Sequence, residues 1–308
     1  MKTVSNAITI LGVFVADTAY RADRSPHMGE TILGNSFALG PGGKGSNQAV
    51  AAARLGGDVT IITRLGDDAF ADMADGIWTD SGVKQAVIRD PKSYTGAAYI
   101  FVEEASGDNA IIVCPGAAND IDVSMIEQNA GLITNSAVFM TQLEQPISVA
   151  RYALEIARNA GVTTILNPAP AAPLDDQLFA FCDYLTPNET EASELTGRTV
   201  KTIEDAQAAG DVLLAKGVGT AIITLGEQGV LLHTKEHSEH IPAFNVGAVV
   251  ETTGAGDSFN GGFATGLAEG LAPIEAVRLG CAAAAISVTR PGTAPSMPSR
   301  EEVEKILS

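Results

Sequence analysis

The feature that most constrains the fold is the alternation of short apolar segments with amphipathic segments along the chain. Six segments of six to nine residues are rich in β-branched residues and have the pattern of buried strands: 7–15, 58–66, 136–143, 162–167, 183–188 and 220–226. The clearest helical pattern between them follows Pro146 and places four apolar residues on one face: Ile147, Ala150, Leu154 and Ala157. Strands that alternate with helices predict an α/β fold, with a mostly parallel central sheet covered by helices on both faces.

Two regions, residues 29–39 and 94–114, break this alternation. The second contains two strand-like segments separated by the turn-forming residues "ASGD" at 105–108. Together the two regions predict a small β-sheet lid, with segments at approximately 13–40 and 94–115. No linker-like or repeated stretch divides the chain, so we expect a single domain over residues 1–308.

The charge balance argues against two classes of partner. The chain has 37 acidic and 19 basic residues, a formal net charge of −18, which repels both nucleic acid and anionic membrane surfaces. We therefore expect a small neutral ligand, no nucleic acid and no membrane. The N-terminal apolar run is interrupted by Asp17, too early for a membrane span, and lacks a signal-peptide pattern, so a cytoplasmic location is expected.

Neither the cysteines nor the histidines have the spacing of a metal site. Cys114, Cys182 and Cys281 are few, odd in number and scattered, which indicates a reducing compartment and packing in the core. All four histidines are interpreted as solvated side chains: His27, His233, His237 and His240.

The segment "ETTGAGDSFNGG" at 251–262 is the first candidate for chemistry. Gly254 and Gly256 allow backbone N–H groups to approach a ligand, and the helix predicted to follow adds its unpaired N–H groups and positive dipole end. An acid beside such an anion hole suits one task, which is to accept a proton from a hydroxyl that attacks a phosphoryl group, and Asp257 fits it. The alternative is a simple turn in which Asp257 or Ser258 caps the helix.

A second glycine cluster, "LGPGGKGSNQAVAAARLG" at 39–56, joins the predicted lid to an Ala-rich helix. Lys44 is followed by Gly45 rather than Ser or Thr, which disfavours a P-loop, and the cluster does not follow the first strand as a dinucleotide-binding motif would. Small residues and the amide of Asn47 suit sugar hydroxyls. The alternative is a tight loop with a solvated lysine.

Five segments together resemble the ribokinase-like sugar kinase family: "GGKGSNQAVAAARLG" (42–56), "NPAPA" (167–171), "TPNETEASELTG" (186–197), "ITLGEQGV" (223–230) and "ETTGAGDSFNGGF" (251–263). The resemblance extends over nearly the whole chain, in order. It implies the ribokinase-like three-layer fold and an ATP-dependent carbohydrate kinase. Within the family, the implied substrate is D-ribose and the product D-ribose 5-phosphate.

The resemblance also implies roles for individual residues. The base that deprotonates the sugar falls on Asp257, and the anion hole on the backbone of Gly254, Ala255 and Gly256. The sugar-contacting positions are Val15, Asp17, Gly43, Lys44, Asn47, Glu144 and Asp257. At the position of Val15, family members of the ribose-binding type carry Asn, so the sugar preference is open at this position.

The nucleotide and ion sites implied by the resemblance lie elsewhere in the chain. ATP-binding positions are Asn188, Thr224, Gly226, Gly229 and Gly256, and Glu191 helps to hold Mg²⁺, in part through water. A monovalent-cation site for K⁺ is implied at Glu251, Thr253, Ser287, Arg290, Gly292 and Ser296. Glu251 stands where the family usually has Asp, one methylene shorter. We also expect a homodimer formed through the lid strands.

Two other functions stay open at the level of sequence. One is a kinase of the same fold that acts on 2-deoxyribose, another carbohydrate or a nucleoside. The other is a non-catalytic regulator that binds a sugar or nucleotide. The presence of Asp257 together with its glycines argues against the second.

Overall fold

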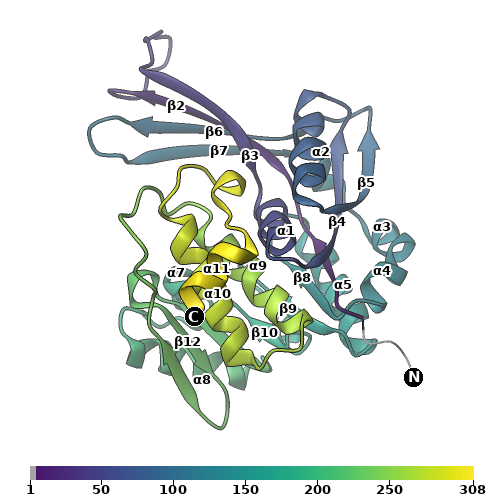
Figure 1. Cartoon of the computed structure of the whole chain (residues 1–308). Coiled ribbons are helices and arrows are strands. Elements are labelled where there is room, and N and C mark those ends of the chain that lie inside the picture. Colours follow the sequence, from purple (N-terminus) through teal and green to yellow (C-terminus); the bar gives the residue numbers. More distant parts are fainter. Residues whose placement is uncertain (1–4) are drawn as a thin grey trace.

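The computed structural model describes residues 5–308, and its body is built on a nine-stranded sheet (Figure 1). The strands are β1 (Ala7–Leu11), β4 (Asp58–Gly66), β5 (Lys84–Asp90), β8 (Val138–Thr141), β9 (Thr163–Leu166), β10 (Tyr184–Leu185), β11 (Thr220–Thr224), β12 (Val230–His233) and β13 (Ser238–Ile241). Their order is β13-β12-β11-β10-β9-β8-β1-β4-β5. The strands from β11 to β5 run parallel, whereas β12 pairs antiparallel with both β11 and the edge strand β13.

Helices cover both faces of this sheet. One face carries α1 (Lys44–Arg54), α2 (Ala69–Ser81), α9 (Ala255–Ala268), α10 (Pro273–Ser287) and α11 (Arg300–Leu307). The other carries α3 (Val123–Gln128), α4 (Ala130–Thr134), α5 (Ile147–Asn159), α6 (Asp176–Phe179), α7 (Glu189–Thr196) and α8 (Ile203–Ala215). Short 3₁₀ helices complete the chain: η1 (Ala117–Asp120), η2 (Gly226–Gln228) and η3 (Ala294–Ser296).

The central strands are apolar because both of their faces are buried, whereas the edge strands β5 and β13 are partly exposed and carry charged residues. In β8, Val138 and Met140 belong to the core cluster under α1 and α9, whereas Phe139 belongs to the cluster under α5. Helix α5 buries Ala150 and Leu154 as its pattern predicts. The predicted α/β fold is confirmed.

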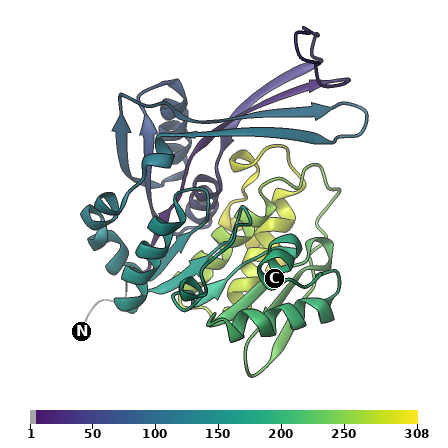
Figure 2. The same ribbon diagram turned by 180° about the vertical axis from the view of Figure 1, so that it is seen from behind.

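A second sheet projects from the body and forms the lid (Figures 1 and 2). Its strands are β2 (Val15–Ala22), β3 (Ser36–Gly42), β6 (Thr95–Glu103) and β7 (Asn109–Gly116), in the order β3-β2-β6-β7. The segment predicted as one strand over 7–15 is therefore two strands, β1 and the start of β2. The break occurs because the carbonyl of Val13 accepts the N–H of Ser46 in α1 (3.1 Å) instead of joining a ladder. Asp17 lies within β2, one of the lid strands.

Two predictions of exposure were wrong. Cys114 is exposed rather than in the core because it lies on β7, the edge strand of the lid, whereas Cys182 and Cys281 are buried. His233 is buried rather than solvated, because its ring packs under α8, where it bonds Asp211 (3.0 Å) and Ser238. Within residues 5–308, every helix is too short or too polar to cross a membrane.

Candidate active site

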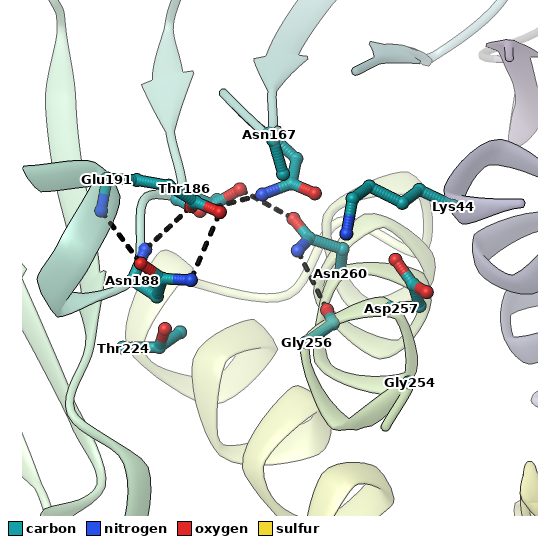
Figure 3. A pocket seen from close by; sticks show the side chains of 11 residues that line it. Lys44, Asn167, Thr186, Asn188, Glu191, Thr224, Gly254, Gly256, Asp257 and Asn260 are labelled. Carbon is teal, nitrogen blue, oxygen red and sulfur yellow. Dashed lines mark hydrogen bonds between the residues drawn. The ribbon is translucent and has the colours of Figure 1, made fainter. Parts of the chain in front are cut away.

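The candidate active site lies where β9, β10 and β11 end, beside the N-terminus of α9 (Figure 3). Ligands of open parallel sheets commonly bind at this edge. A cavity of about 150 Å³ is lined there by Lys44, Asn167, Ala169, Thr186, Asn188, Glu191, Thr224, Gly254, Gly256, Asp257 and Asn260. The structure thus brings together residues that are as much as 216 positions apart in sequence, between Lys44 and Asn260.

Asp257 lies in the first turn of α9 and is only 7% exposed. Asn47 Nδ2 donates to its Oδ2 and Gln48 Nε2 donates to its Oδ1, each at 3.0 Å. Both donors come from α1, which can approach α9 because Gly261 has no side chain. A Cβ at Gly261 would lie 2.5 Å from the Cβ of Ala51, closer than packed atoms allow.

The N-terminus of α9 presents backbone amides to the cavity. Gly254 is its N-cap in the left-handed conformation, with φ of 83°, and both Gly254 and Gly256 line the cavity. The amide of Ala255 donates to the carbonyl of Thr252 (3.1 Å), so it closes a turn and is not free for a ligand in this state. An anion at this helix end would therefore meet the next amides, those of Gly256 and Asp257, together with the positive dipole end.

Lys44 stands among carboxylates. Figure 3 shows its side chain extending toward Asn260 and Asp257. Burial lowers the pKa of the Lys44 ammonium, but the nearby carboxylates, Asp257 foremost, raise it above its ordinary value overall. The backbone N–H of Lys44 also donates to Glu144 Oε2 (2.8 Å).

Burial raises the pKa of two carboxyl groups around Lys44, those of Asp17 and Glu144. Burial, followed by repulsion from Asp257 and Glu251, raises the pKa of Asp17 to about 6. Burial also raises the pKa of Glu144 to about 7, although Lys44 opposes the rise. Neutral or cationic ligand groups that donate hydrogen bonds would relieve this crowding.

The other predicted sugar positions, apart from Asp257, lie outside the lining of the 150 Å³ cavity. Val15 and Asp17 are on β2 and, two residues apart, share one face of that strand. Val15 is 6% exposed and belongs to a core cluster with Val13 and Ala98. Gly43 connects β3 directly to α1.

The opposite wall of the cavity comes from β10, β11 and α7. Asn188 caps α7, and Glu191 completes a capping box: Glu191 N donates to Asn188 Oδ1 (2.8 Å) and Asn188 N donates to Glu191 Oε2 (2.9 Å). Thr224 ends β11, and its N–H donates to the carbonyl of Pro187 (3.0 Å). Gly226 and Gly229 form the turn between β11 and β12, outside the cavity lining.

Comparison with known proteins identifies the family of this chain. The family model "pfkB family carbohydrate kinase" matches residues 6–300. The chain belongs to this family of carbohydrate kinases. This confirms the family resemblance inferred from the five sequence segments.

Several pfkB relatives match over their full length. Ribokinase of Haemophilus influenzae is 40% identical, with 97% of this chain and 98% of the relative covered. Deoxyribokinase of Salmonella typhimurium is 37% identical, with 98% of each covered. Among solved structures, Arabidopsis thaliana ribokinase complexed with ribose and ATP has a TM-score of 0.94 at 31% identity, with 99% of each chain covered.

The family resemblance implies a Mg²⁺ site, so we ask which side chains could hold this ion. Within residues 5–308, no group of three or more His, Cys, Asp or Glu side chains could hold a metal ion. Mg²⁺ commonly binds through one or two carboxylates, water and substrate phosphates, and the buried carboxylate of Glu191 at the cavity wall fits that mode. Its Oε1 and Oε2 each accept one bond from Asn188, which leaves lone pairs for water.

The loops assigned to a monovalent cation also lie together in the kinase. Val250 N donates to the carbonyl of Val288 (2.7 Å), and Glu251 reaches across so that its Oε2 accepts the N–H of Gly292 (2.8 Å). The Arg290 guanidinium is paired with Glu302, so its charge is balanced within the protein. Thr253 is exposed, whereas Ser287 and Ser296 are buried.

Four polar residues that line the cavity or bond to Asp257 had no predicted role: Gln48, Asn167, Thr186 and Asn260. Asn167 and Thr186 directly follow strands, so their place at the carboxyl ends of parallel strands was a usable signal. Asn260 is one helical turn from Asp257, on the same side of α9. Gln48 gave no comparable signal, because only packing of α1 against α9 reveals what it contacts.

Proposed function

We propose that this kinase transfers the γ-phosphoryl group of ATP to the 5-hydroxyl of D-ribose. The observation that carries the proposal is the buried carboxylate of Asp257 at the amino end of α9, facing a polar cavity. The sugar oxygen forms a bond to the γ-phosphorus while the bond from that phosphorus to the β-phosphate oxygen breaks, and ADP leaves. Asp257 takes the hydroxyl proton, and the amides at the start of α9 stabilise the negative charge on the transferred group.

The two substrates would occupy opposite sides of Asp257. Asp17, Lys44, Asn47 and Glu144 offer acceptors and donors for sugar hydroxyls on the lid side. Asn188 and Thr224 would contact the nucleotide on the other side. The full-length relatives that carry the name ribokinase, and the relative solved with ribose and ATP, support this assignment.

Two ions complete the proposal. Mg²⁺, held by the ATP phosphates and by water on Glu191, would neutralise phosphate charge. K⁺ would bind between the Glu251 loop and the loop that contains Ser287, Gly292 and Ser296, mostly through carbonyl oxygens. Because these loops flank the start of α9, an ion there would stiffen the anion-binding end of the helix.

A second candidate substrate, 2-deoxyribose, is favoured by one observation. Val15 shares a face of β2 with Asp17 and cannot form a hydrogen bond. A ribose hydroxyl facing Val15 would lose a partner, whereas a deoxy position would lose nothing. A relative named deoxyribokinase matches the chain at 37% identity.

The function is tested with an assay coupled to ADP release, in buffer containing Mg²⁺ and K⁺. The panel contains ribose, 2-deoxyribose, fructose, other pentoses and nucleosides. We expect the highest kcat/KM with ribose or 2-deoxyribose. Saturable sugar binding in calorimetry without ADP release for any compound would support the non-catalytic regulator instead.

The cation proposal has its own test. Rates are measured in K⁺, Na⁺ and a bulky organic cation at matched ionic strength, and we expect the highest rate in K⁺. Equal rates in all three salts would contradict a functional site at Glu251, whose side chain is longer than the usual Asp.

We further propose that the kinase forms a homodimer through the lid and works in the cytoplasm. One face of the lid exposes Tyr20, Phe37, Leu39, Tyr99 and Ile112. Contiguous apolar surface of this kind commonly marks an interface. Light scattering after gel filtration should give a dimer mass for the parent protein and a monomer mass for Ile112→Lys.

A further inference from the structure

A chain of buried amide side chains lies behind Asp257. Gln48 and Gln142 are completely buried, and Asn167 at the cavity wall is 7% exposed. Gln142 Nε2 donates to Gln48 Oε1. Gln48 Nε2 in turn donates to Asn167 Oδ1 (3.1 Å) and to Asp257 Oδ1 (3.0 Å). The ends of β8 and β9 are thus connected through α1 to the carboxylate.

Asn167 and Asp257, the two acceptors of Gln48, require the same orientation of its side-chain amide. A backbone carbonyl only accepts, and that of Thr186 accepts from Asn167 Nδ2 (3.0 Å; Figure 3). Asn167 must therefore turn its oxygen toward Gln48. An ionised Asp257 also only accepts. Gln48 must therefore present its nitrogen to both, and its oxygen is left for Gln142.

We infer that Gln48, held in place by Gln142, is a positioning residue that fixes the plane of the Asp257 carboxylate and favours its ionised form. The inference rests on the proposed role of Asp257 as the base. Asn47 donates to the second carboxylate oxygen, so each oxygen has one fixed donor and keeps a lone pair for the sugar hydroxyl. Gln48 lies outside the cavity lining and acts through Asp257.

Charged groups from several elements act on the same carboxylate. They are Lys44 on α1, Asp17 on β2, Glu144 after β8 and Glu191 on α7. Burial raises the pKa of Asp257, and Lys44, Asn47 and Gln48 oppose that rise. Removing the Gln48 donor leaves the other groups in place, so the pKa of Asp257 should rise further and its acceptor geometry should loosen.

The test compares Gln48→Met with the parent protein. Met has similar length but no amide, so the packing volume is nearly kept. The pH dependence of kcat and the KM for the sugar are measured with the full chain from about pH 5 to about pH 9. We expect kcat to fall about tenfold and the acid limb of its pH profile to move up by about one unit, while the KM for the sugar changes less than about threefold.

Two further variants separate positioning from a general loss of core packing. Gln142→Met removes only the donor to Gln48 Oε1, so Gln48 is held less firmly and we expect a smaller shift of the acid limb in the same direction. Gln145→Met is the matched control, because Gln145 is a buried amide that donates to Thr141 Oγ1 and to the Gln142 carbonyl and has no bond to Asp257. Its pH profile should equal that of the parent.

The outcomes are distinguishable from those for the proposed function. If Asp257→Asn loses turnover but the acid limb stays in place in Gln48→Met, the positioning role is wrong and the base stands. If Asp257→Asn retains turnover, the base assignment itself is wrong. Should Gln48→Met not fold, Gln142→Met decides: a shifted acid limb supports the inference, and an unshifted one overturns it.

Discussion

The residues proposed for the sugar and those proposed for the nucleotide differ in kind. The lid side relies on ionisable groups, with Lys44 surrounded by Asp17 and Glu144. The proposed nucleotide side has two neutral groups, Asn188 and Thr224, placed by a capping box and by the end of a strand, and a single carboxylate, Glu191, which is held in that capping box. The comparison teaches that the sugar side should respond to pH and to bound charge, whereas the nucleotide side should respond mainly to loss of local backbone structure.

The largest effect is expected at Asp257, which lies between the sugar side and the nucleotide side. In Asp257→Asn we expect kcat to fall by at least ~10²-fold, with the KM of both substrates changed little, because the proton acceptor is lost at nearly constant shape. Steady-state kinetics over both substrates measures this. Gly254, not Asp257, is the N-cap of α9, so near-parental turnover would leave Asp257 only the structural role of accepting from Asn47 and Gln48.

The nucleotide wall is tested with Asn188→Ala. We expect the KM for ATP to rise about tenfold while the KM for the sugar is unchanged, and the loss of the cap to cost ~1 kcal/mol of unfolding free energy.

Thr202→Ala provides a matched control for this loss, because Thr202 closes a similar capping box on α8, whose residues lie outside the cavity lining. It should show a similar loss of stability and an unchanged KM for ATP. If the KM for the sugar rose as much as that for ATP in Asn188→Ala, the sugar side and the nucleotide side would not be independent.

The lid side is tested by pH. The raised pKa values of about 6 for Asp17 and about 7 for Glu144 mean that both groups gain protons as the pH falls from alkaline values through 7 and 6. Since ionised carboxylates are the stronger acceptors, we expect the KM for the sugar to rise about fivefold over this fall, and the KM for ATP to change less than about twofold.

The same shifts carry a stability prediction for the sugar-free protein. A carboxyl whose pKa is higher in the folded state destabilises that state when ionised, so this destabilisation is present in alkali and relieved as the pH falls through 7 and 6. Asp17→Asn should therefore raise the unfolding temperature more at alkaline pH than at acid pH. Equal effects at both would contradict the crowding of charges.

The last prediction concerns Val15. In the parent protein we expect a smaller preference for ribose over 2-deoxyribose than an Asn would give. Val15→Asn should move the ratio of the two kcat/KM values toward ribose by about fivefold, the effect of one modest hydrogen bond. If the ratio does not move, Val15 packs only in the core and Asp17, Asn47 and Glu144 set the preference.

The layers could be predicted from the sequence for a physical reason, whereas most of the predicted cavity residues, such as Asn188, Glu191 and Thr224, came from the family resemblance. Periodicity reports burial, and the runs around β8 and β9 are buried on both faces, so their pattern is clear. Glycines beside an acid mark a helix end that can bind an anion, which located Asp257.

Two features could not be predicted from the sequence, because they depend on contacts between elements that are distant in the chain. The break between β1 and β2 is set by a hydrogen bond from Ser46 in α1, which no local pattern encodes. Likewise, Gln48 reads as one more polar residue in an Ala-rich helix. Its bond to Asp257, 209 residues away, exists only once α1 and α9 are packed together.

The join between lid and body has a mechanical consequence. β3 ends at Gly42 and α1 begins at Lys44, so Gly43 is the only residue between them. A strand and a helix are stiff, whereas one residue offers two soft torsions, φ and ψ. A tilt of the lid is therefore converted into torque on the first turn of α1 unless Gly43 absorbs it, and that turn leads into the residues that hold the carboxylate of Asp257.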